Sequence, residues 1–350
     1  MVTNIFPIFN NIKMNIASPR KVKYIPRALV YSGLIIMQQP FHWLELIFFK
    51  RKIESHQLKH APIIILGYWR SGTTYLQRLL CLNPEIAYLT QYEAFLPLGS
   101  SIHTRIFKPL LNLILKVLKI KHPSHGVFLD MNFPSEEDIA LISAAYPNTP
   151  MWSHVYSNRA NFYFDKLLIS ELGSEESNSF INMYTHVVKK LSYFNLNKQL
   201  VLKSPCNTTK IAEILSAFPN AKFIYIKRNY RDVYFSNIKL LSNNYHQWLQ
   251  TMSKQQMTDL FISSYPRVIR QYDNTKNLIS EQNLIEIEFD ELCENPKKIL
   301  YEIHSKLNIQ QCDKSEKKID EFLEENHLKQ VHSYSEQLPK NVKEMIEQLY

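Results

Sequence analysis

The stretch "IIILGYWRSGTTYLQRLL", residues 63–80, decides the fold of this chain. Its unbroken apolar start is typical of a strand inside a parallel sheet, and its end has the apolar spacing of a helix. Between them, Gly67 and Gly72 match the glycines of the phosphate-binding pattern G-x-x-x-x-G-K-[ST]. Thr73 occupies the lysine position of that pattern, and Thr74 follows it. The sequence therefore predicts an anion-binding loop with altered chemistry.

The cation of this loop is Arg70. In the standard loop, backbone amides cradle phosphates, the lysine reaches the β- and γ-phosphates, and the hydroxyl holds Mg²⁺. The amides of residues 71–74, two hydroxyls and one guanidinium suit a single phosphate group, but they lack the lysine expected for a triphosphate with magnesium. The alternative is an ordinary turn between strand and helix, capped by Ser71.

Four strand-like runs, each followed by a helical pattern, predict an α/β fold with a P-loop-like, three-layer parallel sheet flanked by helices. The strands are expected at 62–66, 199–203, 222–227 and 284–289, and the helices at 73–82, 208–217, 230–241 and about 296–306. Residues 83–198 are too long for a minimal crossover. We expect a mainly helical insertion there, over the carboxyl edge of the sheet, forming an acceptor lid. Residues 1–59 would form an N-terminal helical extension, and 60–350 the main domain.

A second anion site is predicted after the run "KFIYIK". Arg228 ends that strand, and Ser236 lies eight residues later on the next helix. Both can converge on one anion near a helix N-terminus. Two anion sites at one edge of a sheet imply a ligand with phosphates at two positions.

The composition favours an anionic partner without choosing one. The 350 residues carry a formal net charge of +9, which suits nucleotides, sulfated or phosphorylated sugars, nucleic acid or an acidic membrane. The four cysteines have no paired metal-ligand spacing and are too few for a disulfide scaffold, so we expect reduced thiols at Cys81, Cys206, Cys293 and Cys312.

Residues 29–49 are strongly apolar, but Gln38, Pro40 and Glu45 interrupt them, so they make a poor membrane span. No secretory signal is evident. The first 51 residues carry seven lysines and arginines against one acid, so this segment could lie on an anionic bilayer. We favour the alternative, a helical pair that packs on the main domain. The expected localisation is cytoplasmic, with peripheral membrane contact left open.

Residues 106–120 should form a helix with Lys108, Asn112, Lys116 and Lys119 on one stripe. Such a helix fits a surface for membrane or lipid substrate and a buried lid equally well. The segment "FPSEED", residues 133–138, predicts a capping box with Ser135 as N-cap and Asp138 three residues on.

Three segments resemble, in order and spacing, the motifs of sulfotransferases that use 3′-phosphoadenosine-5′-phosphosulfate: "GYWRSGTTYLQRLL", "LVLKSPCNTTKI" and "FPNAKFIYIKRNYRDVYFSNI". The resemblance is to the branch of bacterial and tyrosylprotein sulfotransferases, and it covers about residues 60–305. It implies that the donor's 5′-phosphosulfate is bound by Arg70, Ser71, Gly72, Thr73 and Thr74. It likewise implies that Arg228 and Ser236 bind the 3′-phosphate.

The resemblance also implies catalytic residues. The branch often has a tryptophan–glutamate step beyond the loop helix, where this chain has Tyr92 and Glu93, so Glu93 is the candidate general base. Lys203 matches a lysine that contacts the transferring group; the alternative is a strand-end lysine facing solvent. Asn207 stands where relatives often have histidine, and Phe289 replaces a common tyrosine. The glycine-rich C-terminal loop of steroid and phenol sulfotransferases is absent.

The resemblance thus implies sulfuryl transfer from the nucleotide to a hydroxyl or amine, with a carbohydrate or lipid as acceptor. Arg70, Lys203 and Glu93 would be catalytic, and neither a metal nor a nucleic acid is expected. One alternative is a P-loop nucleotide kinase, although the loop lysine is missing. The other is an inactive membrane-surface protein that binds nucleotide.

Overall fold

The computed structural model describes residues 7–17, 22–120, 129–147, 149–156, 159–242, 252–310, 312–325, 334 and 336–349. The chain divides into two compact units. Unit 1 comprises residues 1–57, 89–167 and 240–252, and unit 2 comprises residues 58–88, 168–239 and 253–350. The predicted domain boundary near residue 60 remains a prediction.

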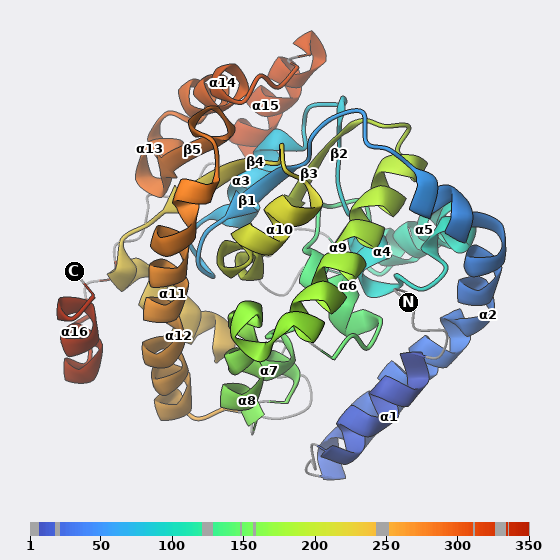
Figure 1. Ribbon diagram of the computed structural model, residues 1–350, viewed down its shortest axis with the longest axis horizontal. Helices are drawn as coiled ribbons and strands as arrows, with labels where there is room; N and C mark the ends of the chain where they lie inside the picture. Colours follow the sequence, from blue (N-terminus) through green and yellow to red (C-terminus); the bar gives the residue numbers. More distant parts are fainter. Residues whose placement is uncertain are drawn as a thin grey trace. The chain divides into compact units, whose positions relative to one another are not determined.

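Unit 2 contains a five-stranded sheet of order β2-β3-β1-β4-β5, in which all neighbouring strands are parallel (Figure 1). The strands are β1 Ile63–Leu66, β2 Ile86–Ala87, β3 Gln199–Lys203, β4 Lys222–Lys227 and β5 Leu284–Glu288. Ile63 is in register with Val201 on one side and with Lys222 on the other. The α/β fold predicted from the apolar runs is therefore confirmed. The two-residue strand β2 was not predicted.

Helices cover both faces of this sheet, giving three layers. On one face, Ile63 and Ile65 pack with Leu76 and Leu79 of α3 in the main apolar core, which α14 and α15 extend. On the other face, the ring of Tyr225 stacks on Tyr272 of α12 at 3.6 Å. The α-helices of unit 2 are α3 Thr73–Leu80, α9 Ser174–Phe194, α10 Ile211–Ala217, α11 Tyr230–Leu241, α12 Lys254–Thr275, α13 Phe289–Glu294, α14 Pro296–Lys306, α15 Asp313–Glu325 and α16 Lys340–Glu347.

The described elements of unit 1 are helical. They are α1 Pro7–Ala17, η1 Val22–Tyr24, α2 Ile25–Ser55, α4 Gln91–Phe95, α5 Ser100–Val117, α6 Glu137–Ser143, α7 Trp152–Val155, α8 Ala160–Phe164 and η3 Asp165–Leu167. Tyr24 and Ala28 pack against Trp152 and Tyr156 in one apolar cluster. The start of the chain therefore shares a core with the segment predicted as an insertion.

The polar residues that interrupt the apolar run of α2 face this interior. Gln38 accepts a hydrogen bond from the amide of Leu98 at 3.1 Å. Glu45 accepts from the amide and the hydroxyl of Ser101, at 3.1 and 2.5 Å. Large apolar side chains of the same helix, such as Ile47, are exposed. Helix α2 thus buries polar groups beside apolar ones such as Ile35 and Ile53, and exposes several large apolar side chains.

Two local predictions in unit 1 are wrong. Helix α6 has Glu136 as its N-cap, without a side-chain cap, so Ser135 does not begin a capping box. Asp138 instead accepts a hydrogen bond from the hydroxyl of Thr149. Helix α5 ends at Val117, and Lys119 has a positive φ of 51°, so Lys119 lies beyond the helical stripe.

No helix among the described residues is long and apolar enough to cross a membrane. Among the described residues, Cys81, Cys206, Cys293 and Cys312 form no disulfide.

Candidate functional site

The loop between β1 and α3 has a strained, compact backbone. Arg70 has a φ of 71° and Gly72 a φ of 101°, in the left-handed region that non-glycine residues seldom adopt. Gly72, and not Ser71, is the N-cap of α3, so the turn capped by Ser71 is excluded. The amide of Ser71 donates to the carbonyl of Tyr68 at 3.1 Å. Among the predicted amide donors, those of residues 72–74 at the start of α3 therefore suit an anion best.

Phe289, directly after β5, fixes the form of this loop. A Cβ added at Gly72 would lie 2.1 Å from Cδ2 of the Phe289 ring, so only glycine fits there. The guanidinium of Arg228 lies 4.4 Å from the centre of the same ring. The phenyl ring thus supports both the loop glycine and the arginine of the second predicted site.

The two predicted anion sites are contiguous. Arg70 donates from Nε to the hydroxyl oxygen of Ser236 at 2.9 Å, and Arg228 donates from Nη1 to the carbonyl of Arg70 at 2.9 Å. The Nε atom of Arg228 is buried and has no hydrogen-bond partner among the residues that the structure describes. A buried charged donor of this kind calls for an acceptor. A phosphate oxygen meets that requirement, so this part of the site fits a phosphorylated ligand.

Lys203 lies at the carboxyl end of β3 and is only 2% exposed. Its Nζ donates to the hydroxyl of Thr74 at 3.2 Å. The alternative that Lys203 simply faces solvent is therefore wrong. Burial raises the pKa of the neighbouring Cys81 thiol well above its usual value, although the charge of Lys203 opposes this shift.

Two further residues that the sequence did not single out anchor the loop. Thr208, on η5 Pro205–Thr209, accepts from the amide of Gly67 at 2.8 Å through its hydroxyl. Asn237 of α11 donates to the carbonyl of Trp69 at 2.9 Å. The two bonded residues are 141 positions apart in the first bond and 168 in the second, so both bonds tie the loop to distant parts of the sequence.

Glu93 belongs to unit 1 and is the third residue of α4. Its Oε2 accepts from the amide and the hydroxyl of Thr90, at 3.0 and 2.6 Å, and its own amide donates back to that hydroxyl at 3.3 Å. This is a capping box. The carboxylate therefore has a structural role at the start of α4.

Within the described residues, no group of three or more histidine, cysteine, aspartate or glutamate side chains is arranged to hold a metal ion.

A model of the sulfotransferase family matches residues 62–313. The match covers well over half of the chain, so this chain belongs to the sulfotransferase family and is a sulfotransferase enzyme. This assignment decides against a nucleotide kinase and against an inactive membrane-surface protein.

Among the chain's relatives is the omega-hydroxy-beta-dihydromenaquinone-9 sulfotransferase Stf3 of Mycobacterium bovis. It is 26% identical over 284 residues, which cover 81% of this chain and 71% of the relative, and the Mycobacterium tuberculosis protein of that name matches equally. Sulfotransferase STF1 from Mycobacterium tuberculosis has a similar structure, with a TM-score of 0.70 and 14% identity over 94% of this chain and 86% of that one. Sulfotransferase STF9 from Mycobacterium avium follows, with a TM-score of 0.66 and 16% identity over 93% and 82%. At these identities the solved structures confirm the fold.

Proposed function

We propose that this sulfotransferase uses 3′-phosphoadenosine-5′-phosphosulfate as its donor and the hydroxyl group of a lipid as its acceptor. The observation that carries the donor assignment is the joined arrangement of Arg70, Ser236 and Arg228, with the buried Nε of Arg228 available to an acceptor. Such an arrangement suits a ligand with anionic groups at two positions.

The donor would use both parts of the site. Arg70, the amides of residues 72–74 and the hydroxyls of Ser71, Thr73 and Thr74 bind the 5′-phosphosulfate in this proposal. Arg228 and Ser236 bind the 3′-phosphate. The hydrogen bond between Arg70 and Ser236 opens when the nucleotide offers phosphate oxygens to both side chains.

The chemical step is an in-line displacement at sulfur. The acceptor oxygen forms a bond to sulfur while the bond from sulfur to the 5′-phosphate oxygen breaks, and adenosine 3′,5′-bisphosphate leaves. Arg70, Lys203 and the loop amides stabilise the charge that develops on the leaving oxygen. Glu93 takes the proton of the acceptor hydroxyl.

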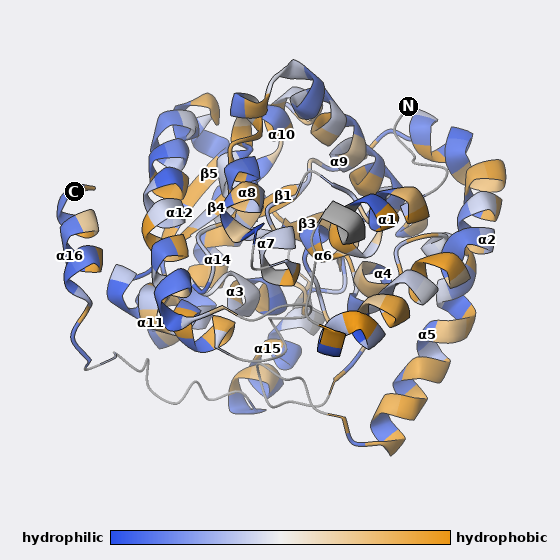
Figure 2. Ribbon diagram, turned by 90° about the horizontal axis from the view of Figure 1, so that it is seen from below, coloured by the Kyte–Doolittle hydropathy of each residue, from blue (hydrophilic) through white to orange (hydrophobic). Residues whose placement is uncertain are grey.

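The choice of a lipid over a carbohydrate has two supports. The name of the relative Stf3 specifies a hydroxylated dihydromenaquinone as its acceptor. In this chain, α5 exposes a row of apolar side chains at helical spacing, Phe107, Leu110 and Ile114, and much of the helix is orange in Figure 2. Such a row suits a hydrocarbon more than a sugar.

We also propose that unit 1 meets an anionic bilayer. Helix α2 exposes Ile36, Ile47 and Phe48, and its last turns carry three consecutive basic residues, 50–52. Exposed apolar side chains near clustered positive charge suit an interface with acidic lipid headgroups.

The test of the proposed function is product formation with sulfur-labelled donor. Long-chain alcohols in detergent and soluble oligosaccharides are offered in parallel, and labelled sulfate ester is expected with the alcohols. Labelled oligosaccharide instead would overturn the lipid assignment. In calorimetry, adenosine 3′,5′-bisphosphate should bind and ATP with Mg²⁺ should not; the reverse preference would overturn the donor assignment.

A further inference from the structure

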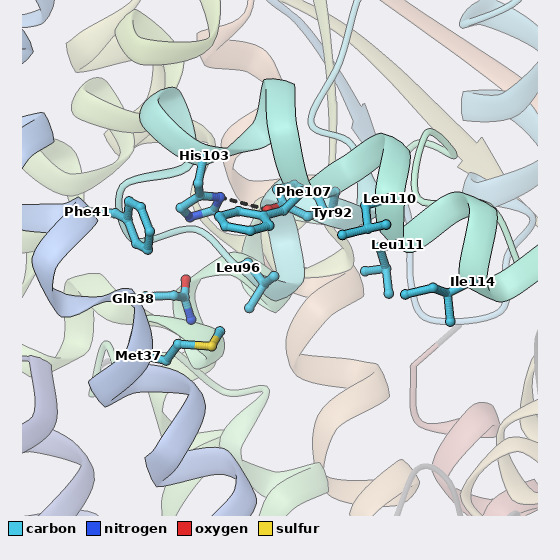
Figure 3. Close-up of a pocket in the computed structure, with 10 residues that line it drawn as sticks. All are labelled: Met37, Gln38, Phe41, Tyr92, Leu96, His103, Phe107, Leu110, Leu111 and Ile114. Atoms are coloured by element: carbon cyan, nitrogen blue, oxygen red, sulfur yellow. Dashed lines mark hydrogen bonds between the residues drawn. The ribbon is translucent and has the colours of Figure 1, made fainter.

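Unit 1 contains a pocket of about 300 Å³ between α2, α4 and α5 (Figure 3). Met37, Gln38 and Phe41 line it from α2, and Tyr92 and Leu96 line it from α4 and the residue after it. Helix α5 supplies the rest of the lining with His103, Phe107, Leu110, Leu111 and Ile114. Its volume is at the lower end of the range of ligand sites, about 300–1,000 Å³.

Most of these lining groups are hydrocarbon. The rings of Phe41 and Phe107 meet edge to face at 6.0 Å, and Figure 3 shows the aliphatic side chains of α5 continuing along the pocket from them. Several lining side chains are well exposed, Met37 by 55% and Leu110 by 52%, so the pocket is an open groove with an apolar wall. A hydrocarbon that enters it removes this apolar surface from water, which favours binding.

The three polar residues of the lining have their hydrogen bonds within unit 1. Gln38 donates to the carbonyl of Leu34 at 3.0 Å and accepts from the amide of Leu98 at 3.1 Å. Tyr92 and His103 bond to each other at 2.7 Å, and the other ring nitrogen of His103 bonds to the carbonyl of Leu98 at 3.1 Å. These bonds leave the polar groups little need of a partner from a ligand.

The protonation states of Tyr92 and His103 are consistent with these hydrogen bonds. Burial, together with the carboxylate of Glu93, raises the pKa of Tyr92 to about 12, so its hydroxyl stays protonated. It then donates to Nδ1 of His103, and Nε2 of His103 donates to the carbonyl of Leu98.

We infer that this pocket binds the hydrocarbon chain of the lipid acceptor, an inference that rests on the proposed function for the identity of the occupant. The ligand class is an unbranched or isoprenoid hydrocarbon segment attached to a hydroxyl, because a polar or charged segment would lose its hydration without gaining partners. The pocket thereby selects for chain length, whereas the reacting hydroxyl lies outside it.

The test is calorimetric binding of octan-1-ol, decan-1-ol and dodecan-1-ol to the full-length protein without nucleotide. Each methylene that enters an apolar site strengthens binding by roughly fourfold. We expect this gain until the pocket is full, and then a plateau. Partition into detergent-like aggregates or onto an open surface would give no plateau, and that result, like the absence of binding, would overturn the pocket.

Two neighbouring residues of α5 give a matched pair of variants. Leu110 lines the pocket and is 52% exposed; Leu113 does not line it and is 58% exposed. Both accept lysine without a buried cavity, so the fold is retained. Leu110→Lys should weaken dodecan-1-ol binding by at least roughly tenfold, since it brings a charge to the lining. Leu113→Lys should bind as the wild type does. Equal losses would place binding on the outer surface of α5 and overturn the pocket.

Activity assays distinguish a failure of the pocket assignment from a failure of the proposed function. With labelled donor, Leu110→Lys should raise KM for dodecan-1-ol and leave the affinity for adenosine 3′,5′-bisphosphate unchanged. If the wild type binds alkanols with a plateau but sulfates no alcohol, the proposed function fails, and with it the identity of the occupant. If alcohols are sulfated but Leu110→Lys changes neither binding nor KM, the pocket assignment alone fails.

Discussion

Arg228 differs from the other predicted donor-binding residues because its Nε is buried without a partner among the described residues. Arg228→Ala should therefore weaken binding of adenosine 3′,5′-bisphosphate by about 1.5–3 kcal/mol, the usual size of a hydrogen bond to a charged group. Adenosine 5′-phosphate, which has no 3′-phosphate, should lose little. Calorimetry with the two nucleotides measures both effects.

Arg228 also lies against Phe289 and holds the carbonyl of Arg70, so its loss could disturb the loop. Arg228→Lys serves as the control because it keeps the charge and loses the fork of donors. It should recover part of the binding. Equal losses for both nucleotides in Arg228→Ala would contradict the assignment of the 3′-phosphate.

Glu93 can be tested without removing its structural role. Glutamine at the third position of a helix also completes a capping box, so Glu93→Gln should retain α4 and the melting temperature. It cannot accept a proton at neutral pH, so turnover should fall on the order of 10²–10⁴-fold while donor affinity is unchanged. Single-turnover assays with labelled donor measure this.

Thr90→Ala is the matched control, because it removes the other half of the capping box and costs about 1 kcal/mol of stability. If Glu93 is the base, Thr90→Ala should lower the melting temperature but keep turnover within a few-fold of the wild type. If Glu93 acts only as a cap, Glu93→Gln should turn over within a few-fold of the wild type.

The sequence could predict the charged residues of this site but not what surrounds them. Arg70, Arg228 and Ser236 follow strands of one parallel sheet, and such positions meet at its carboxyl edge. The ring of Phe289 against Gly72 depends on how the turn after β5 packs, which no local pattern encodes. The hydrogen bond from Arg70 to Ser236 likewise depends on a side-chain direction.

At the level of elements, β4, β5 and α12 are joined through one carboxylate. Tyr272 donates to Glu286 at 2.5 Å, and Lys227 donates to its other oxygen at 2.9 Å. Burial alone would raise the pKa of Glu286, but these two bonds and the charges of Lys227 and Lys276 outweigh it and hold the pKa below the ordinary value of 4.5. The folded state is thus stabilised while this group is ionised.

Glu286→Ala should therefore destabilise the protein by about 1–2 kcal/mol at pH 7, partly because it leaves the hydroxyl of Tyr272 without its acceptor. Since the folded-state pKa is depressed, the charge-dependent part is present above pH 4.5 and is lost as the pH falls through the folded-state pKa. Urea unfolding at pH 7 and at about pH 3 should show the smaller difference between variant and wild type at low pH. A difference independent of pH would show that packing, not charge, joins these elements.

The strands and following helices were predictable because buried parallel strands read as apolar runs. Strand β2 has only two residues, too few to form a pattern. In α2 the apolar pattern did not indicate which side chains are buried. Gln38 and Glu45 are buried and hydrogen-bonded, whereas Ile47 is 74% exposed. Their partners Leu98 and Ser101 lie more than 50 residues away, so no local pattern could show that these polar positions are interior.

For the whole molecule, the basic net charge and the outward apolar residues of α2 bear on where the protein works. If unit 1 meets an anionic bilayer, the full-length protein should bind vesicles of phosphatidylcholine containing phosphatidylglycerol and should bind pure phosphatidylcholine vesicles weakly. Raising the salt to about 1 M shortens the Debye length to about 3 Å, so binding to the anionic vesicles should fall. Co-sedimentation measures both.

Phe48→Glu supplies the decisive variant, because Phe48 is 59% exposed on α2 next to the basic residues 50–52. It removes an apolar contact and adds a charge that the acidic headgroups repel, so vesicle binding should weaken by roughly tenfold or more. Leu278→Glu is the control: Leu278 is 57% exposed but belongs to unit 2, and its variant should bind vesicles almost as the wild type does. Equal losses in the two variants would mean that net charge, and not α2, governs the attraction. Binding that depends on neither salt nor phosphatidylglycerol would contradict the attraction to anionic headgroups. If neither kind of vesicle binds the protein, unit 1 does not meet a bilayer, and a lipid acceptor must reach the enzyme from micelles or a carrier.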